Sequence, residues 1–191
     1  MPIFPTSRRA AASPETRVRA AIDTHYDGVW RFLRRFGVAE SDAEDAAQKV
    51  FVVFAEKLAS IDPRAEKSFL FSSAVRIASD ARKKHARSRE DLASASEHVE
   101  PSDPAPSAED QIDDRRRRQW LDQVLADLPD DNRAVLLLVD VEGHTMADAS
   151  DVLGIPQGTV ASRLRRAREL FETGAMELKQ RLQAKEARGE S

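Results

Sequence analysis

Apolar residues recur three and four positions apart along this chain, and that spacing restricts what it can fold into. The clearest stripe lies between Ser41 and Leu58, at Ala43, Ala47, Val50, Phe51, Phe54 and Leu58. Such spacing places these side chains on one face of a helix. The chain has only 7 Gly and 1 Tyr in 191 residues, a composition that also disfavours a sheet. An all-α fold is therefore predicted, with no strand required.

The same spacing divides the chain into helices with recognisable ends. Gly37 is expected to stop the first helix. Ser41, with Glu44 three residues later, predicts a capping box at the start of the second. The predicted helices run from Pro14 to about Arg35, Ser41 to Leu58, about Glu66 to Ser88, near Asp110 to Leu128, Pro129 to Gly143, Thr145 to Leu153, and Thr159 to about Leu182.

The net charge of −3 conceals a strong segregation of charge. The stretch from Glu90 to Asp114 contains acidic residues but no Lys or Arg, and it is rich in Ser, Ala and Pro. Residues 91–108 are therefore expected to form a flexible acidic linker between two small helical domains, residues 15–90 and 109–175. Residues 1–14 are expected to be a disordered tail. Residues 176–191 are expected to be a charged helical tail, either a solvated extension or a partner-binding helix.

Several functional classes are disfavoured by what the chain lacks. It has no Cys, which excludes a disulfide framework and a thiolate metal site and makes the cytoplasm the default compartment. The longest apolar runs are far shorter than a membrane span, and the N-terminus lacks the apolar core of a signal peptide. The four His residues lie far apart, and no phosphate-binding loop occurs. Neither a metal, a cofactor nor an enzymatic activity is expected.

The segment Thr145–Phe171 has the pattern of a helix-turn-helix. A short helix ends at Gly154, and a second helix starts near Gln157. Its expected buried positions are Val160, Leu164, Ala167 and Phe171. Its other face carries Thr159, Ser162, Arg163, Arg165, Arg166 and Arg168. Arginine suits both guanine edges and phosphates, so this face is typical of a recognition helix in the major groove. The alternative is an ordinary helical hairpin with a solvated basic face.

Two segments closely resemble a known family. The first is Asp127–Phe171, DLPDDNRAVLLLVDVEGHTMADASDVLGIPQGTVASRLRRARELF, which resembles region 4 of the extracytoplasmic-function sigma factors. The second is Ser41–Leu58, SDAEDAAQKVFVVFAEKL, which resembles their region 2.2. Phe69–Arg82 resembles the following helix, which melts the promoter and reads its −10 element. The resemblance implies a transcription initiation factor with a region 2 helical bundle and a region 4 helix-turn-helix.

The resemblance also implies the residues that make contact. Docking on the largest subunit of core RNA polymerase is implied for Asp42, Glu44, Asp45 and Gln48. Without the resemblance, a solvated acidic helix face is the simpler interpretation. Capture of the −10 element is implied for the loop Ser60–Lys67 and the helix after it, at Ile61, Arg64, Lys67, Arg76, Asp80, Arg82 and Lys83. Recognition of the −35 element is implied for Thr159, Ser162, Arg163, Arg165, Arg166 and Arg168. The implied partners are core RNA polymerase, promoter DNA and an anti-sigma factor.

The chain also departs from the family pattern. Phe69 replaces the usual Trp of the melting helix, Arg76 replaces an Asn, and Ala161 replaces a Lys or Arg. Ala149 stands at a position that is usually larger, which predicts a thinner core in the second domain. Two alternatives therefore stay open. One is a helix-turn-helix regulator that binds duplex DNA alone, and the other is a sigma-like decoy that occupies polymerase without opening DNA.

Overall fold

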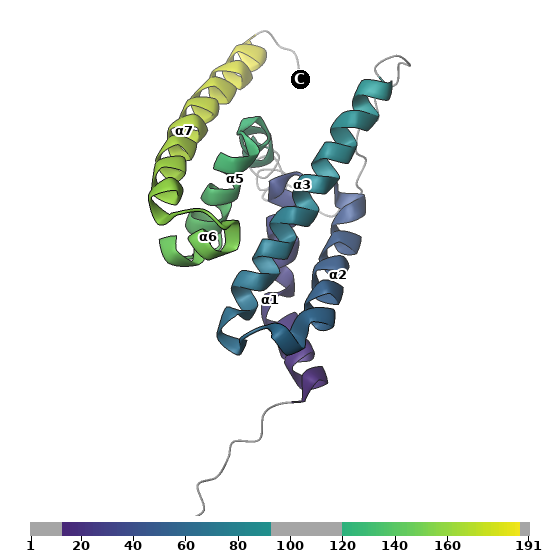
Figure 1. Cartoon of the computed structure of the whole chain (residues 1–191). Helices are drawn as coiled ribbons and strands as arrows, with labels where there is room; N and C mark the ends of the chain where they lie inside the picture. The colour runs from purple at the N-terminus through teal and green to yellow at the C-terminus, as the bar shows by residue number, and fades with distance from the viewer. Residues whose placement is uncertain (1–12, 93–119, 188–191) are drawn as a thin grey trace, which may run out of the picture.

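The computed structural model describes residues 13–92 and 120–187, and every regular element in those ranges is helical. In the first half, α1 (Pro14–Phe36), α2 (Glu40–Lys57) and α3 (Glu66–Leu92) form a bundle, with the short turns η1 (Leu58–Ser60) and η2 (Pro63–Ala65) between α2 and α3. The second half contains a helix that ends at Asp127, then α5 (Asp130–Leu136), the π-helical turn η3 (Leu137–Val141), α6 (Met146–Leu153) and α7 (Gln157–Ala187). Figure 1 shows the two groups of helices side by side, with α7 on the outer edge. The predicted all-α fold is confirmed.

The first helix ends where the sequence predicts, but the second begins earlier. Gly37 adopts the left-handed conformation, with φ of 111°, and its N–H donates to the carbonyls of the last turn of α1. The predicted cap at Ser41 is wrong, because α2 already starts at Glu40 with Ala39 at its N-cap and no side-chain cap. The reason is that the chain turns sharply after Gly37. Ser41 therefore lies in the first turn of α2, where its hydroxyl donates to the Asp42 carboxylate at 3.2 Å.

The first bundle is closed by aromatic side chains from all three helices. Every residue of the predicted α2 stripe is buried, and so is Ala46 beside it. Phe32 of α1 packs edge-to-face on Phe71 of α3, with ring centroids 5.5 Å apart. Phe54 of α2 lies 6.2 Å from Phe69. The periodicity is less accurate near the start of α1, where Ile22 lies on the same apolar stripe as Val29 but is 37% exposed.

The helix-turn-helix forms as the sequence predicts. Thr145 caps α6 in a reciprocal capping box with Asp148, and the hydrogen bonds from Thr145 lower the pKa of that carboxyl. Gly154 ends α6 in the left-handed conformation, at φ of 64°. Val160, Leu164 and Ala167 are buried as expected, whereas Phe171 is half-buried. Ala149 is fully buried, so the small residue allows α6 to sit against its neighbours.

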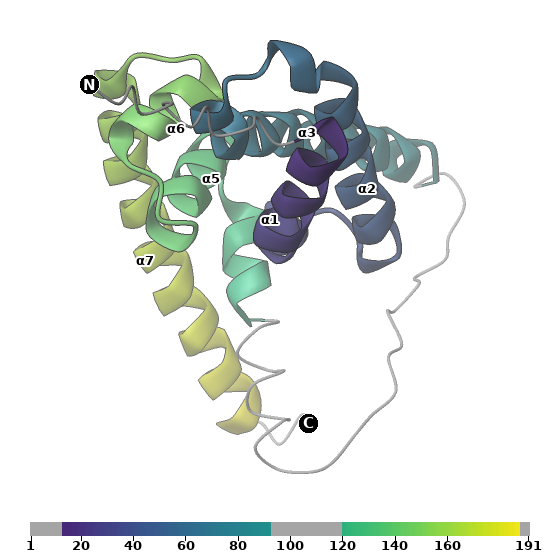
Figure 2. The ribbon, with the colours of Figure 1, turned by 90° about the horizontal axis from the view of Figure 1, so that it is seen from below.

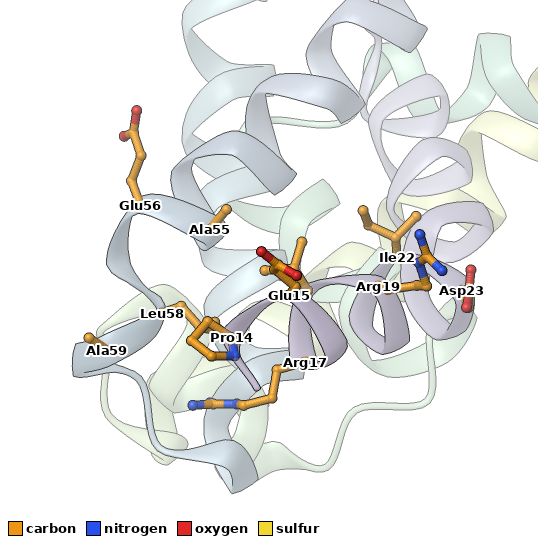
Figure 3. Close-up of a pocket in the computed structure, with 11 residues that line it drawn as sticks. Pro14, Glu15, Arg17, Arg19, Ile22, Asp23, Ala55, Glu56, Leu58 and Ala59 are labelled. Carbon is orange, nitrogen blue, oxygen red and sulfur yellow. The ribbon is translucent and has the colours of Figure 1, made fainter. Parts of the chain in front are cut away.

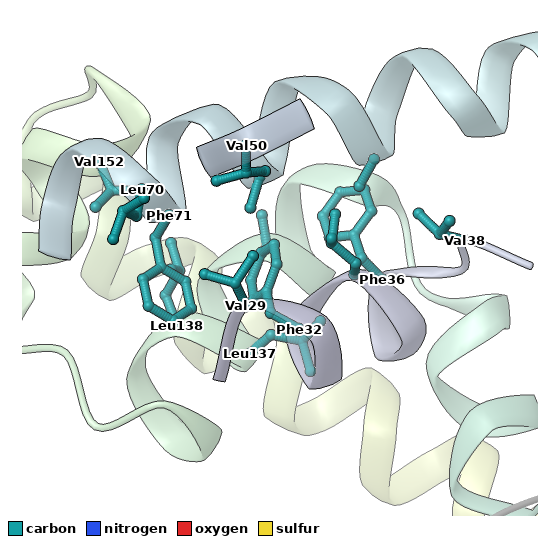
Figure 4. Packing of buried hydrophobic residues seen from close by; sticks show 14 of the residues in the cluster. Val29, Phe32, Phe36, Val38, Val50, Leu70, Phe71, Leu137, Leu138 and Val152 are labelled. Carbon is teal, nitrogen blue, oxygen red and sulfur yellow. The ribbon is translucent and has the colours of Figure 1, made fainter. Parts of the chain in front are cut away.

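The two groups of helices also pack on each other and share one hydrophobic core. Helix α3 lies against α6, and α1 lies against α5 and η3 (Figure 2). Figure 4 shows Leu137, Leu138 and Val152 from the second half beside Val29, Phe32, Leu70 and Phe71 from the first. The sequence predicted two domains and a linker, and it did not predict this contact. The predicted linker lies outside the described residues except at its start, where α3 continues to Leu92.

Candidate nucleic-acid interface

The basic face of α7 is built by a helix whose opposite face is anchored in the core. Val160 and Leu164 are buried beneath it, and this fixes the rotation of the helix. The amide of Asn132 in α5 adds a second anchor by donating to the carbonyl oxygen of Arg163 at 3.1 Å. Of the predicted −35 residues, Ser162, Arg165, Arg166 and Arg168 are exposed, and Thr159 and Arg163 are half-buried. The structure therefore brings all six onto one helix, four of them fully open to solvent.

Each arginine of this face is held by a carboxylate of the same chain. Arg163 pairs with Asp131 of α5 at 2.7 Å. Arg168 forms a two-pronged contact with Asp140, at 2.7 and 2.9 Å, and this contact raises its pKa.

A single carboxylate serves the other two arginines. Glu169 accepts hydrogen bonds from Arg165 at 2.6 Å and from Arg166 at 3.3 Å, and those bonds lower its pKa. Exposed ion pairs of this kind contribute little to stability because solvent screens them, so an anion can displace the carboxylates at little cost.

The predicted polymerase-binding residues share the outer face of α2. Asp42, Glu44, Asp45 and Gln48 are all exposed, and the buried stripe of the same helix faces α1 and α3. Val52, four residues beyond Gln48, is 55% exposed on the same face. The polymerase-binding residues implied by the sequence do not include Val52. The spacing of three and four residues from Asp45 through Gln48 to Val52 was the signal that could have identified it.

An open groove lies beside this face, between the N-terminal part of α1 and the end of α2. Its volume is about 790 Å³, and Figure 3 shows Pro14 and Ile22 from α1 opposite Ala55, Leu58 and Ala59 from the end of α2 and η1. The exposed part of Ile22 lies in this groove. Ala55 and Glu56 line the groove and lie one turn beyond Val52 on α2. The groove therefore adjoins the exposed face of α2.

The segment Ser60–Lys67 is fixed to the first bundle by one arginine. Arg17 of α1 donates to the carboxylate of Glu66 at 2.6 and 3.0 Å and to the carbonyl oxygen of Ile61 at 3.1 Å. Asp62 caps the short turn η2 by accepting from the backbone N–H of Arg64 at 2.8 Å. Ile61 is buried in the bundle, whereas Arg64 is exposed. Of these two predicted −10 residues, only Arg64 presents its side chain to solvent.

The structure places the other predicted −10 residues on two different faces of α3. Arg76, Asp80 and Lys83 are exposed and follow one another at helical spacing. Lys67 and Arg82 are half-buried and face the second half of the protein. The Lys67 ammonium donates to the carbonyl oxygen of Glu142 at 3.2 Å, and the Arg82 guanidinium pairs with Asp130 at 3.2 Å. The first set is therefore open to solvent, whereas the second is bonded to the second half of the protein.

Comparison with known proteins identifies the family. A model of sigma-70 region 2 matches residues 21–88, and a model of sigma-70 region 4 matches residues 118–171. A probable RNA polymerase sigma-C factor of Mycobacterium bovis is 30% identical over 168 residues, which are 84% of each chain. This chain belongs to the extracytoplasmic-function sigma factors of the sigma-70 family. The family consists of transcription initiation factors rather than enzymes.

Other relatives and solved structures agree with this assignment. The sigma factor SigE of Mycolicibacterium smegmatis is 30% identical over 146 residues, and the chain spans 56% of its length. The ferric citrate uptake sigma factor FecI of Escherichia coli is 29% identical over 166 residues and is spanned to 93%. The sigma factor RpoE of Bartonella quintana, solved with the anti-sigma factor NepR, has a TM-score of 0.65 at 20% identity, covering 82% of this chain and 94% of that one. CnrH, solved with the cytosolic domain of CnrY, has a TM-score of 0.61 at 22% identity, covering 82% of this chain and 85% of that one. These structures share the fold.

Within residues 13–92 and 120–187, no group of three or more His, Asp or Glu side chains could hold a metal ion. No helix in these two ranges is long and apolar enough to cross a membrane.

Proposed function

We propose that this sigma factor directs promoter-specific transcription initiation, in the cytoplasm and without catalytic activity of its own. It binds core RNA polymerase through the outer face of α2, reads duplex −35 DNA through α7, and captures the −10 element through Ser60–Lys67 and α3. The observation that carries this proposal is a region 2 bundle and a region 4 helix-turn-helix in one chain, with an arginine face on the recognition helix. Residues 15–90 and 109–175 are assigned to the two functional domains, with residues 91–108 as their linker.

Partners follow from the same assignment. Core RNA polymerase and promoter DNA are required for the activity, and an anti-sigma factor is proposed as the inhibitor. Of the solved proteins with this fold, the sigma factor RpoE is in complex with the anti-sigma factor NepR, and CnrH is in complex with the cytosolic domain of CnrY. Reconstitution with purified core polymerase and a promoter template tests the proposal directly. A helix-turn-helix regulator would bind DNA but give no transcript with core polymerase, and a decoy would bind the polymerase without producing one.

The outer face of α2 is expected to supply the main polymerase contact. Reversing the charge at Asp45 and replacing Gln48 with alanine should weaken the affinity for core polymerase at least tenfold, because the change disrupts the proposed contact surface. Both side chains are exposed, so the fold should be unaffected. Affinity would be measured by competition with a labelled sigma factor, and helicity by circular dichroism. Glu177→Lys in α7 is the control, since it makes the same charge reversal at an exposed position far from α2. Equal affinity of the double variant and the parent protein would rule out this surface.

Promoter choice is expected to divide between the two halves. Arg165→Gln and Arg166→Gln should alter −35 preference, since a bidentate arginine–guanine pair contributes about 1–3 kcal/mol of base discrimination. Replacing the exposed residues of Ser60–Lys67 should alter −10 preference and leave −35 preference unchanged. Transcription from a promoter library randomised at both elements measures the two preferences together. Arg181→Gln, near the other end of α7, is the matched control.

The free protein is expected to bind duplex promoter weakly. Unstacking and unpairing a base costs a few kcal/mol, which one contact does not return, so the polymerase must hold the strands apart. If the change in Ser60–Lys67 altered −35 choice, or if the free protein bound promoter DNA tightly and specifically, this division between the halves would be refuted.

A further inference from the structure

The contact between the two halves engages residues that the proposed function needs elsewhere. Lys67 and Arg82, both on the inner face of α3, hydrogen-bond or pair with Glu142 and Asp130 of the second half. Helix α3 also packs on α6. In this packed arrangement, the closed form, Lys67 and Arg82 bond to the second half of the chain and are not available to DNA. What holds the closed form together determines when these residues become available.

One end of the contact is a polar clasp at the C-terminus of α1. The guanidinium of Arg133 in α5 is fully buried and donates to the carbonyl oxygen of Phe36 at 2.7 Å. Arg82 donates to the same carbonyl at 3.1 Å. Both cations lie where the helix leaves unsatisfied carbonyls and a partial negative charge. This clasp keeps its charges at every pH that a protein tolerates, because arginine does not lose its proton.

The other end of the contact is formed by His144, in the turn between η3 and α6. Its imidazole is only 3% exposed and packs edge-on against the ring of Phe71 in α3, with centroids 4.7 Å apart. Neither Nδ1 nor Nε2 has a hydrogen-bond partner. An imidazolium has two N–H donors and a positive charge, and a site that satisfies neither is far costlier for it than for the neutral ring.

The charged groups around His144 add to this cost. The Lys67 ammonium of α3 and His25 of α1 both oppose a positive charge on His144, and Asp148 of α6 favours one. Burial is the largest effect, and together these lower the pKa of His144 to about 4. Two more carboxyl groups lie near the contact, and their protonation favours the packed form rather than the separated one. Burial raises the pKa of Glu142, against Arg31, Arg35 and Lys67, and that of Asp122, against Arg34 and Arg35.

We propose that His144 makes the closed form acid-sensitive, so that protonation of its imidazole separates the two halves and exposes Lys67 and Arg82. The closed form binds the proton more weakly than the open form, in which His144 is solvated and has an ordinary pKa near 6.5. The contribution of His144 to the stability of the closed form is therefore fully present above about pH 6.5 and is lost as the pH falls toward 4. Between pH 7.5 and pH 5.0 this one group shifts the equilibrium toward the open form by about 25-fold.

Energy transfer between two dyes measures the separation of the halves without any polymerase or DNA. The chain has no Cys, so Glu56→Cys in α2 and Lys179→Cys in α7, both exposed, give two unique labelling sites, one in each half. The expected result is a fall in transfer efficiency between pH 7.5 and pH 5.0, reversed on return to pH 7.5. His144→Phe keeps an aromatic ring against Phe71 but cannot be protonated, so its efficiency should fall much less over the same pH range. His144→Leu is the second variant, and circular dichroism at pH 7.5 checks that both are folded.

The same comparison is made in an Asp130→Asn background, which removes the ion pair with Arg82 and should raise the open population further at every pH. Glu142 and Asp122 titrate in all the proteins compared, so the difference between the parent and His144→Phe isolates the imidazole. An identical pH response in the parent and both His144 variants would overturn the proposal. So would the lack of any response in the Asp130→Asn background. Neither outcome depends on whether the chain initiates transcription.

Discussion

Arg133→Met is expected to lower the free energy of unfolding by about 3–5 kcal/mol. The guanidinium donates to the carbonyl oxygens of Ala126 at 2.6 Å, Leu128 at 2.8 Å and Phe36 at 2.7 Å, in a site with no exposed surface. Hydrogen bonds to a charged group contribute about 1.5–3 kcal/mol each, and a buried carbonyl left without a donor costs about 1–3 kcal/mol. Arg82 still reaches Phe36, so the main loss is at the two carbonyls that end the helix before α5.

Urea denaturation followed by circular dichroism measures this change. Arg181→Met is the matched control, because it makes the same replacement on an exposed arginine that pairs with Glu177 at 3.7 Å, and it should cost less than about 1 kcal/mol. Arg133→Lys should recover only part of the stability, since one ammonium group cannot reach three diverging carbonyls as a planar guanidinium does. A loss below about 1 kcal/mol for Arg133→Met would mean that this arginine is dispensable to the fold.

Phe54→Ala is expected to cost about 3–5 kcal/mol of the same free energy, because large-to-small replacements in a packed core lose burial and leave a cavity. Phe54 is fully buried between α2 and its neighbours and contacts the ring of Phe69. Val52→Ala, two residues away on the exposed face of the same helix, should change stability by less than about 0.5 kcal/mol. Denaturant unfolding of both variants gives the comparison. Similar losses for the two would indicate that α2 is not oriented as the structure describes.

Local patterns in the sequence were sufficient to predict the helices and the basic face of α7. The spacing of Val160, Leu164 and Ala167 fixes which side of α7 is buried, and therefore which side carries Arg165 and Arg166. Those relations extend over one or two helical turns, a range in which the chain's own geometry decides the outcome. The stripe on α2 was predictable for the same reason.

The contact between the halves could not be predicted in this way. Arg133 reads as an ordinary helical arginine, because the carbonyl it binds belongs to Phe36, 97 residues earlier. In the sequence, His144 is one of four widely spaced histidines with no metal-binding pattern. Its burial against Phe71 becomes visible in the structure. The error at Ser41 is smaller, since the N-cap lies two residues earlier, at Ala39, and helix ends are commonly uncertain by one or two residues. Pairings between distant segments depend on the whole fold, and a single sequence carries no local trace of them.

The packed arrangement of the two halves also sets a limit of length. A compact chain of this size has a radius of gyration of about 16 Å. The −35 and −10 elements are named for positions 25 base pairs apart, which is roughly 85 Å along straight B-form DNA at 3.4 Å per base pair. A closed sigma factor can therefore touch one element or the other, but it is too short to bridge both. To reach both elements of a promoter at once, the two halves of the chain must therefore first separate.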